Sequence, residues 1–90
     1  MFFEWDAEKN AANIRKHGIY FDDAILVFSD ENYIEYYDDA HSIDEDRYNV
    51  IGMVNDILFV VYTERKRCIR IISARLATPK ERRLYLDRYL

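Results

Sequence analysis

The sequence predicts a small α+β domain with the order β-α-α-β-β-β-β-α, in which helices pack on one side of a mostly antiparallel sheet. Two well-marked helices, one near the start and one at the end of the chain, enclose four segments rich in β-branched and aromatic residues. Short polar turns join the last three of these segments, which is typical of an antiparallel meander. The chain has 90 residues, half of them apolar, so we expect one domain over residues 1–90.

The first 18 residues predict a short strand and a capped helix. Apolar and acidic residues alternate over 2–6, as they do in a strand with one buried face. Asp6 is a good N-cap, Ala7–His17 follows the helical period, and Gly18 supplies the left-handed residue that ends many helices. The period places Ala7, Ala11 and Ile14 toward the core and Asn13 toward solvent.

The middle of the chain predicts a second helix and four strands. Apolar residues recur at the spacing i, i+3, i+4 and i+7 over 21–28, which favours a short helix there. The predicted strands cover residues 33–37, 48–53, 57–63 and 68–74, with turns at 55–56 and 64–67. The third and fourth strands are apolar on both faces, so we expect them at the centre of the sheet.

The final helix has the strongest start signal. Thr78, Pro79 and Glu81 form a capping box with proline at the first helical position. We expect the helix to run to the terminus and to bury Leu84, Tyr85, Tyr89 and one of Leu86 or Leu90.

Charge is divided unevenly along the chain. Residues 1–46 hold 13 acids and 3 bases, a balance of −10, and residues 47–90 hold 4 acids and 10 bases, a balance of +6. A basic C-terminal half indicates a polyanionic partner such as a nucleic acid. The alternative is that the two halves neutralise each other across the fold, with most of the charges simply solvated.

Several classes of protein do not fit the sequence. Its apolar runs are far shorter than the roughly 20 residues of a membrane span, and acids stand where a signal peptide needs apolar residues, so we expect a cytoplasmic protein. The single cysteine, Cys68, cannot form an internal disulfide. His17 and His41 are too few for a zinc site, and the acids of residues 38–46 lack the pattern of a calcium loop, so we expect no metal and no cofactor.

The last predicted strand carries two arginines that point in opposite directions unless a bulge intervenes. Arg75 shares its parity with Ser73, whereas Arg70 shares its parity with Cys68. An arginine in an otherwise apolar strand needs a carboxylate or a phosphate. Arg70 is therefore either a phosphate ligand or a structural partner of an acid such as Glu64 or Glu35.

Cleavage of RNA without a metal requires a base for the 2′-hydroxyl, an acid for the 5′ oxygen and a cation for the phosphorane. Residues of suitable type are Glu64, His17, His41, Tyr62, Arg65, Arg70 and Arg75. Both histidines have a simpler explanation: His17 as a structural residue at a helix end, and His41 as a solvated residue in a polar loop.

Seven segments together resemble the BrnT toxins of bacterial type II toxin–antitoxin systems, over nearly the whole chain. They are Phe3-Glu4-Trp5-Asp6, Lys9-Asn10-x-x-Asn13, Arg15-Lys16-His17-Gly18, Phe21-Asp22-Asp23-Ala24, Ile51-Gly52, Val61-Tyr62-Thr63-Glu64-Arg65 and Arg70-Ile71-Ile72-Ser73-Ala74-Arg75. The resemblance implies a RelE-like fold and a ribonuclease that arrests translation and growth. It also implies a ribbon-helix-helix antitoxin as partner, through which the complex binds its operator DNA.

By the same resemblance, we expect the RNA site to contain two sets of residues. The catalytic candidates are Glu64, Arg65, Arg70, Arg75 and His17, and the substrate-binding candidates are Lys9, Tyr62 and Arg67. The antitoxin is expected to place acidic side chains on Arg65, Arg67 and Arg70. The acidic net charge and the lack of an evident acid/base pair leave an alternative, a catalytically inactive relative that serves as a protein-binding or co-repressor module.

Overall fold

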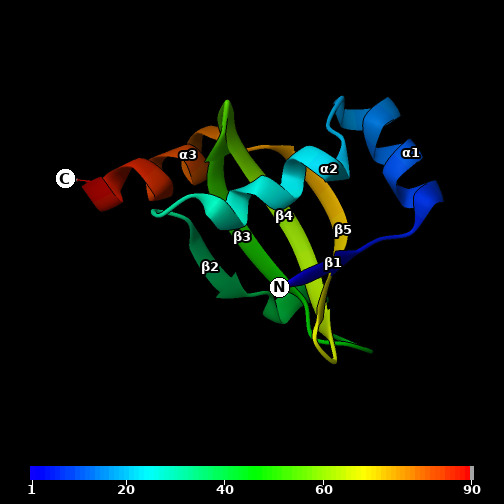
Figure 1. Cartoon of the computed structure of the whole chain (residues 1–90). Coiled ribbons are helices and arrows are strands. Elements are labelled where there is room, and N and C mark those ends of the chain that lie inside the picture. Colours follow the sequence, from blue (N-terminus) through cyan, green and yellow to red (C-terminus); the bar gives the residue numbers. More distant parts are fainter. Residues whose placement is uncertain (90) are drawn as a thin grey trace.

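The computed structural model describes residues 1–89, apart from the side chain of Tyr89, and is built around one five-stranded sheet (Figure 1). The strands are β1 (Phe2–Glu4), β2 (Ile34–Tyr37), β3 (Tyr48–Val54), β4 (Asp56–Arg65) and β5 (Cys68–Leu76), in the spatial order β1-β5-β4-β3-β2. β1 pairs with β5 in parallel, and the other neighbours are antiparallel. The predicted fold class and element order are confirmed.

The helices begin where the caps predict. α1 (Ala7–His17) starts after the Asp6 side chain, which accepts hydrogen bonds from two backbone N–H groups, and it ends at Gly18 with φ +70°. α2 (Phe21–Ala24) occupies the predicted second helix but tightens into a 3₁₀ helix over Ile25–Ser29. α3 (Pro79–Leu86) carries the predicted capping box. No helix among the described residues is long and apolar enough to span a membrane.

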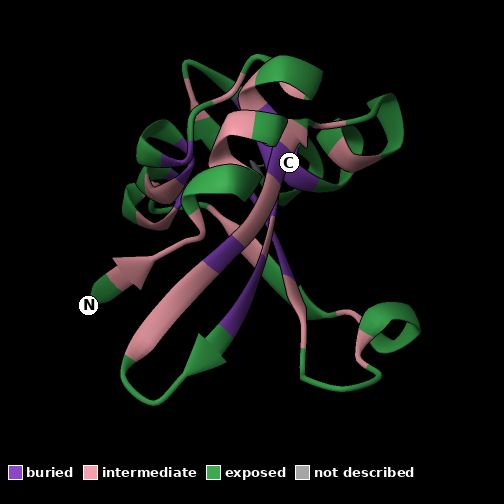
Figure 2. Ribbon diagram, turned by 90° about the vertical axis from the view of Figure 1, so that its right-hand side faces the viewer, coloured by how far each residue is buried: buried purple, intermediate pink, exposed green. Residues whose placement is uncertain are grey.

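The larger hydrophobic core lies between the sheet and the segment formed by α2 and the 3₁₀ helix that follows it. Phe21, Ala24 and Val27 pack against strand residues that include Val60 and Ile71. Buried residues gather where helices meet strands, whereas the outer helix surfaces and the hairpin tips are exposed (Figure 2). This core covers one face of the sheet and leaves much of the opposite face for a site.

Gly52 allows the 3₁₀ helix to approach the sheet closely. A Cβ atom at this position would lie 3.0 Å from the Val27 Cβ and 3.2 Å from the Val27 carbonyl oxygen. Any larger side chain would have to displace the helix.

α3 packs on a second cluster at one end of the sheet. Tyr85 joins Ile51, Ile57 and Phe59, whose side chains alternate along their strands with those of the larger core. The predicted burial of Tyr85 is confirmed, but Leu84 and Leu86 are 48% and 44% exposed, because only one side of this short helix meets the sheet. The Tyr89 side chain and Leu90, the other members of the predicted stripe, lie outside the described part of the chain.

Asn13 fastens α1 to the free edge of β5. Its amide nitrogen donates to the carbonyl oxygens of Ala74 (2.8 Å) and Ile19 (2.9 Å), and its Oδ1 accepts from the Ala74 N–H (3.1 Å). The prediction that Asn13 faces solvent is wrong, since only 6% of it is exposed. β1 pairs with β5 only as far as Arg70, and an amide has the donor and acceptor that the unpaired Ala74 backbone needs.

A β-bulge in β5 changes which side chains share a face. Val61 pairs with Ser73 and Tyr62 pairs with Ile71, so Ile72 is an extra residue. Beyond the bulge the alternation shifts by one residue. Arg70 and Arg75 therefore lie on the same face rather than on opposite faces, and the Arg75 guanidinium sits 4.1 Å from the centre of the Phe59 ring.

Candidate functional site

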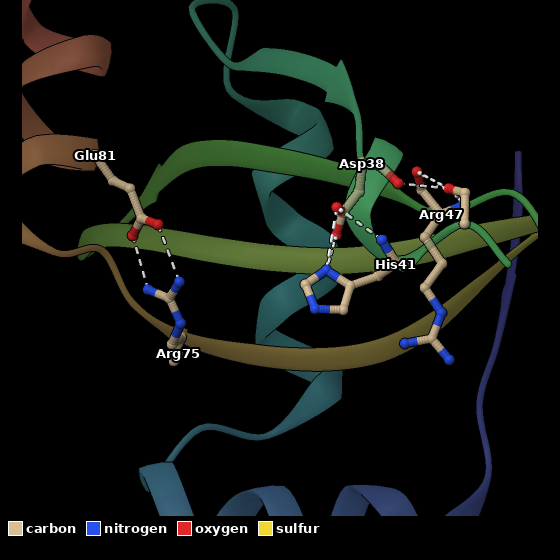
Figure 3. A network of polar contacts seen from close by, with 6 residues as sticks. Asp38, His41, Arg47, Arg75 and Glu81 are labelled. Carbon is tan, nitrogen blue, oxygen red and sulfur yellow. Dashed lines mark hydrogen bonds and ion pairs between the residues drawn. The ribbon is translucent and has the colours of Figure 1, made fainter.

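The face of the sheet opposite α2 carries a cleft of about 360 Å³, which we call the open-face cleft. Its walls come from the loop between β2 and β3 and from strands β3, β4 and β5. The lining residues are Asp38, His41, Arg47, Asn49, Phe59, Val61, Ile72, Ser73 and Arg75. Figure 3 shows His41 between Arg75 and Arg47, above the strands.

Backbone and hydroxyl hydrogen bonds close the loop that holds His41 and Arg47. The Asp38 N–H donates to the Arg47 carbonyl oxygen at 2.9 Å. The Ser42 hydroxyl donates to the Asp38 carbonyl oxygen at 2.6 Å and accepts from the Arg47 N–H at 2.9 Å. The Thr63 hydroxyl, on β4, donates to the Asp46 carbonyl oxygen at 2.6 Å. The loop is thus tied to itself and to the sheet, which gives both side chains a defined position.

His41 and Asp38 form a hydrogen-bonded pair at the rim of the cleft. The His41 Nδ1 lies 3.0 Å and 3.1 Å from the two carboxylate oxygens of Asp38. The histidine side chain is 69% exposed and that of Asp38 is 14% exposed. A carboxylate in this position fixes the ring and its tautomer and leaves Nε2 as the reactive nitrogen.

Arg75 is held across the cleft floor by Glu81 of α3. Two parallel hydrogen bonds of 2.7 Å and 2.9 Å join the guanidinium to the carboxylate (Figure 3). Donation of hydrogen bonds to the Glu81 carboxylate raises the pKa of Arg75 against the opposing effect of burial. Burial acts to raise the pKa of Glu81, but hydrogen bonds from Arg75 and Thr78 outweigh it and leave that pKa below 4.5. Because Glu81 also accepts from the Thr78 N–H at 2.8 Å, Arg75 is anchored to the start of α3.

Arg47 lines the cleft, and its guanidinium is not paired with an acidic side chain of the described structure. No side-chain hydrogen bond or ion pair to it occurs within residues 1–89, and Figure 3 shows it extended over β4 and β5. A half-buried arginine without a carboxylate partner is suited to an incoming phosphate.

Asn49 adds a buried amide to the wall of the cleft. It is 6% exposed, and its Oδ1 is buried with no hydrogen-bond partner in the described structure. Its direct neighbour on β2 is Tyr36. Burial raises the pKa of Tyr36, and the hydrogen bond with Asn49 lowers it by less, so the net shift is upward. Buried polar atoms are usually paired, so this oxygen has capacity for a further hydrogen bond beside the cleft.

Arg70 and Arg65 each bind an acid. Arg70 Nη1 lies 2.8 Å from Glu4 Oε2, because β1 places Glu4 directly opposite Arg70 in the sheet. The prediction that Arg70 pairs with an acid is confirmed, but the acid is Glu4 and not Glu64 or Glu35. Arg65 makes a looser pair of 3.6 Å with Glu45.

Tyr62 is a core residue, which contradicts its assignment as a substrate contact. It is 2% exposed, its ring stacks on Tyr48 at 5.4 Å between centroids, and its hydroxyl donates to Glu35. Burial and then the Glu35 hydrogen bond raise the pKa of Tyr62 far above its ordinary value. A nucleobase of RNA therefore cannot stack on the Tyr62 ring.

The remaining predicted residues are divided between two other hollows. Glu64 and Arg67 line a hollow of about 210 Å³ at the tip of the β4–β5 hairpin, which shares no residue with the open-face cleft. Lys9 and His17 line a hollow of about 290 Å³ beside α1 that shares Ile72 and Ser73 with the cleft. Of the predicted catalytic residues, Arg75 alone lines the open-face cleft.

Sequence reasoning missed Asp38, Arg47 and Asn49. It included His41 among the residues of suitable type but favoured a solvated surface role for it. The spacing of Asp38 and His41 is a local signal for a carboxylate–imidazole pair, because a 3₁₀ helix over Asp39–His41 brings residues three apart together. Arg47 and Asn49 give no such signal, since they reach the cleft only through the pairing of β3 with β4. Within the described residues, no group of three or more His, Cys, Asp or Glu side chains is placed to hold a metal ion.

Comparisons with known proteins agree with the resemblance seen in the sequence. A family model described as the ribonuclease toxin BrnT of type II toxin–antitoxin systems matches residues 5–81. The fold is similar to the crystal structure of the Brucella abortus ribonuclease toxin BrnT, with 26% identity, a TM-score of 0.69, and coverage of 87% of this chain and 99% of that one. No curated protein matches significantly. The chain therefore belongs to the BrnT family of ribonuclease toxins of type II toxin–antitoxin systems.

Proposed function

We propose that this toxin is an endoribonuclease that cleaves RNA in the open-face cleft without a metal ion. The observation that carries the proposal is the Asp38–His41 pair, which shares one cleft with Arg47 and Arg75. An oriented imidazole beside two guanidinium groups supplies a proton acceptor and positive charge at the same place.

The proposed reaction is attack by a ribose 2′-hydroxyl on the adjacent phosphate. His41 Nε2 accepts the 2′-hydroxyl proton while Asp38 stabilises the imidazolium that forms. Arg47 and Arg75 stabilise the charge on the phosphorane. The bond from phosphorus to the 5′ oxygen breaks and that oxygen takes a proton from water. The hydroxide that remains takes the proton held by His41 Nε2, which restores the free imidazole. The products are a 2′,3′-cyclic phosphate and a 5′-hydroxyl.

The other catalytic candidates from the sequence have weaker support. Glu64 lines a different hollow, and neither Arg65 nor Arg70 is among the residues that line the open-face cleft. His17 lies on the far side of the β5 bulge from His41. Their catalytic roles stay predictions, and the geometry favours His41, Arg47 and Arg75.

End-group analysis tests the proposed function. The purified chain is incubated with a single-stranded RNA in the presence of a chelator, and the products are compared with those from the same RNA carrying 2′-O-methyl riboses. We expect cyclic phosphate ends from the first RNA and no cleavage of the second. Cleavage that stops in chelator, or that leaves 5′-phosphate ends, would contradict the mechanism.

A type II toxin has an antitoxin partner, and we propose that this partner is a ribbon-helix-helix protein that covers the open-face cleft. RNA cleavage in the cytoplasm then arrests translation and growth until the antitoxin binds, and operator DNA is contacted through the antitoxin. The half-buried arginines of the cleft and the exposed cations of the β4–β5 hairpin support a partner with acidic side chains. Induced expression should stop growth, and co-expression of the antitoxin should restore it.

One observation favours the alternative, a protein-binding module without catalysis. Four arginines of the basic half, Arg65, Arg70, Arg75 and Arg82, each pair with an acid of the same chain, which reduces the positive field available to RNA. A folded chain that binds its antitoxin tightly and leaves RNA intact at high protein concentration would establish this alternative.

A further inference from the structure

We infer that the hollow beside α1, which we call the α1 hollow, is a second phosphate site for the same RNA strand, and that the strand crosses the edge of β5 at the bulge. The inference rests on the proposed function, because it extends the RNA path from the open-face cleft. The ligand class is the phosphodiester backbone of single-stranded RNA. The cations that would bind it are Lys9 and Lys16.

One face of α1 forms the outer wall of this hollow. Its lining residues on the helix are Lys9, Ala12, Asn13, Lys16 and His17, which follow the spacing i, i+3, i+4, i+7 and i+8. Asn13 is the residue that locks this face against β5. The two lysines are therefore carried on a helix whose rotation about its axis is fixed, and neither makes an ion pair within residues 1–89.

The α1 hollow and the open-face cleft have two lining residues in common. Ile72 and Ser73 line both, and Ile72 is the extra residue of the bulge. β1 has ended before this point, so no strand covers the edge. Bulges are frequent beside functional sites because they interrupt pairing and re-aim side chains. A chain that leaves the cleft over this edge meets the α1 hollow next.

The positive charge of the α1 hollow favours the phosphate groups of an RNA strand as its ligand. The α1 hollow has two lysines and one histidine in its wall and no acidic side chain. The cleft contributes two guanidinium groups, that of Arg47, which has no acidic partner within residues 1–89, and that of Arg75, which is paired with Glu81. Positive groups on both sides of a narrow ridge fit successive phosphates of one extended strand.

Binding of an uncleavable strand measures the inference separately from catalysis. The probe is a fluorescent 2′-O-methyl oligouridylate of about 12 nucleotides. Its dissociation constant is measured over a range of salt concentrations for the wild type and for the double variant Lys9→Ala/Lys16→Ala. The control is Lys80→Ala/Arg83→Ala, which removes two exposed positive charges from α3, outside both hollows.

We expect the slope of log affinity against log salt to fall by about 0.7 for each lost phosphate contact, or about 1.4 for the double variant. The control should keep the wild-type slope, and cleavage of the dinucleotide uridylyl-uridine should be the same for the double variant and the wild type. An unchanged slope in the double variant, an equal loss in the control, or no wild-type binding at all would overturn the inference. If the strand binds as expected but His41→Ala still cleaves RNA, the proposed catalytic role of His41 is wrong, whereas the α1 hollow is still supported as a phosphate site.

Discussion

Replacement of Asn13 by alanine should destabilise the protein by about 3 kcal/mol. Three hydrogen bonds to Ala74 and Ile19 are lost, each with a net value of about 0.5–1.5 kcal/mol, and the buried Ala74 backbone groups are left unpaired. In a domain of this size, each kcal/mol lowers the melting temperature by about 4–8 °C, so we expect a fall of about 12–24 °C.

Urea denaturation followed by circular dichroism gives the free energy of unfolding directly. The matched control is Asn32→Ala at an exposed asparagine, which should change the free energy by less than about 0.5 kcal/mol. Asn13→Asp should lose at least as much as Asn13→Ala, because one oxygen of the buried carboxylate would face the Ala74 and Ile19 carbonyl oxygens with no proton to donate. A loss of less than about 1 kcal/mol in Asn13→Ala would refute the assignment of Asn13 as the closure of the β5 edge.

Three other substitutions test the fold and the site. The free energy of unfolding should decrease as the pH falls below 4.5. The Arg75 hydrogen bonds outweigh the effect of burial and lower the pKa of Glu81, so protonation of Glu81 removes a stabilising contact. Urea titrations should show a smaller decrease in Glu81→Gln. Gly52→Ala should lose about 1–3 kcal/mol in the same assay, since its Cβ would lie 3.0 Å from that of Val27, and an unchanged midpoint would contradict this contact. Tyr62→Phe should lose about 1 kcal/mol and keep the wild-type rate of RNA cleavage, and a loss of cleavage in the folded variant would restore Tyr62 as a site residue.

The sequence was sufficient for elements whose signals are local. Asp6, Gly18 and the Thr78–Glu81 capping box set the ends of two helices through contacts within a few residues, and the positive φ angles of Asn55 and Lys66 are at the two predicted hairpin turns. These interactions require no knowledge of the rest of the fold.

Long-range features were not predictable in the same way. The role of Asn13 depends on where β1 stops pairing with β5, and the common face of Arg70 and Arg75 depends on one extra residue at Ile72. A pattern of period two carries no sign of a bulge, so a single inserted residue reverses every orientation that follows it.

The candidate site was predicted least well because it is assembled from four separate segments. Arg75 was a candidate from its residue type and from the family resemblance, but its partner Glu81 was interpreted only as a capping residue. His41 was placed in a solvated loop, since nothing local shows that Ser42 and Thr63 fasten that loop over the sheet. Sequence alone identified the family of ribonuclease toxins, whereas the cleft became visible only through the register of the strands.

The rate of RNA cleavage by His41→Ala tests the central claim most directly. The purified variant, the wild type and the control Arg83→Ala, an exposed arginine outside the cleft, are compared on one single-stranded RNA after circular dichroism has shown that all three are folded. Loss of a general base typically slows a reaction by about 10²–10⁴-fold, and we expect a decrease in that range for His41→Ala and the wild-type rate for Arg83→Ala. Cleavage by folded His41→Ala at the wild-type rate would contradict a catalytic site in the open-face cleft.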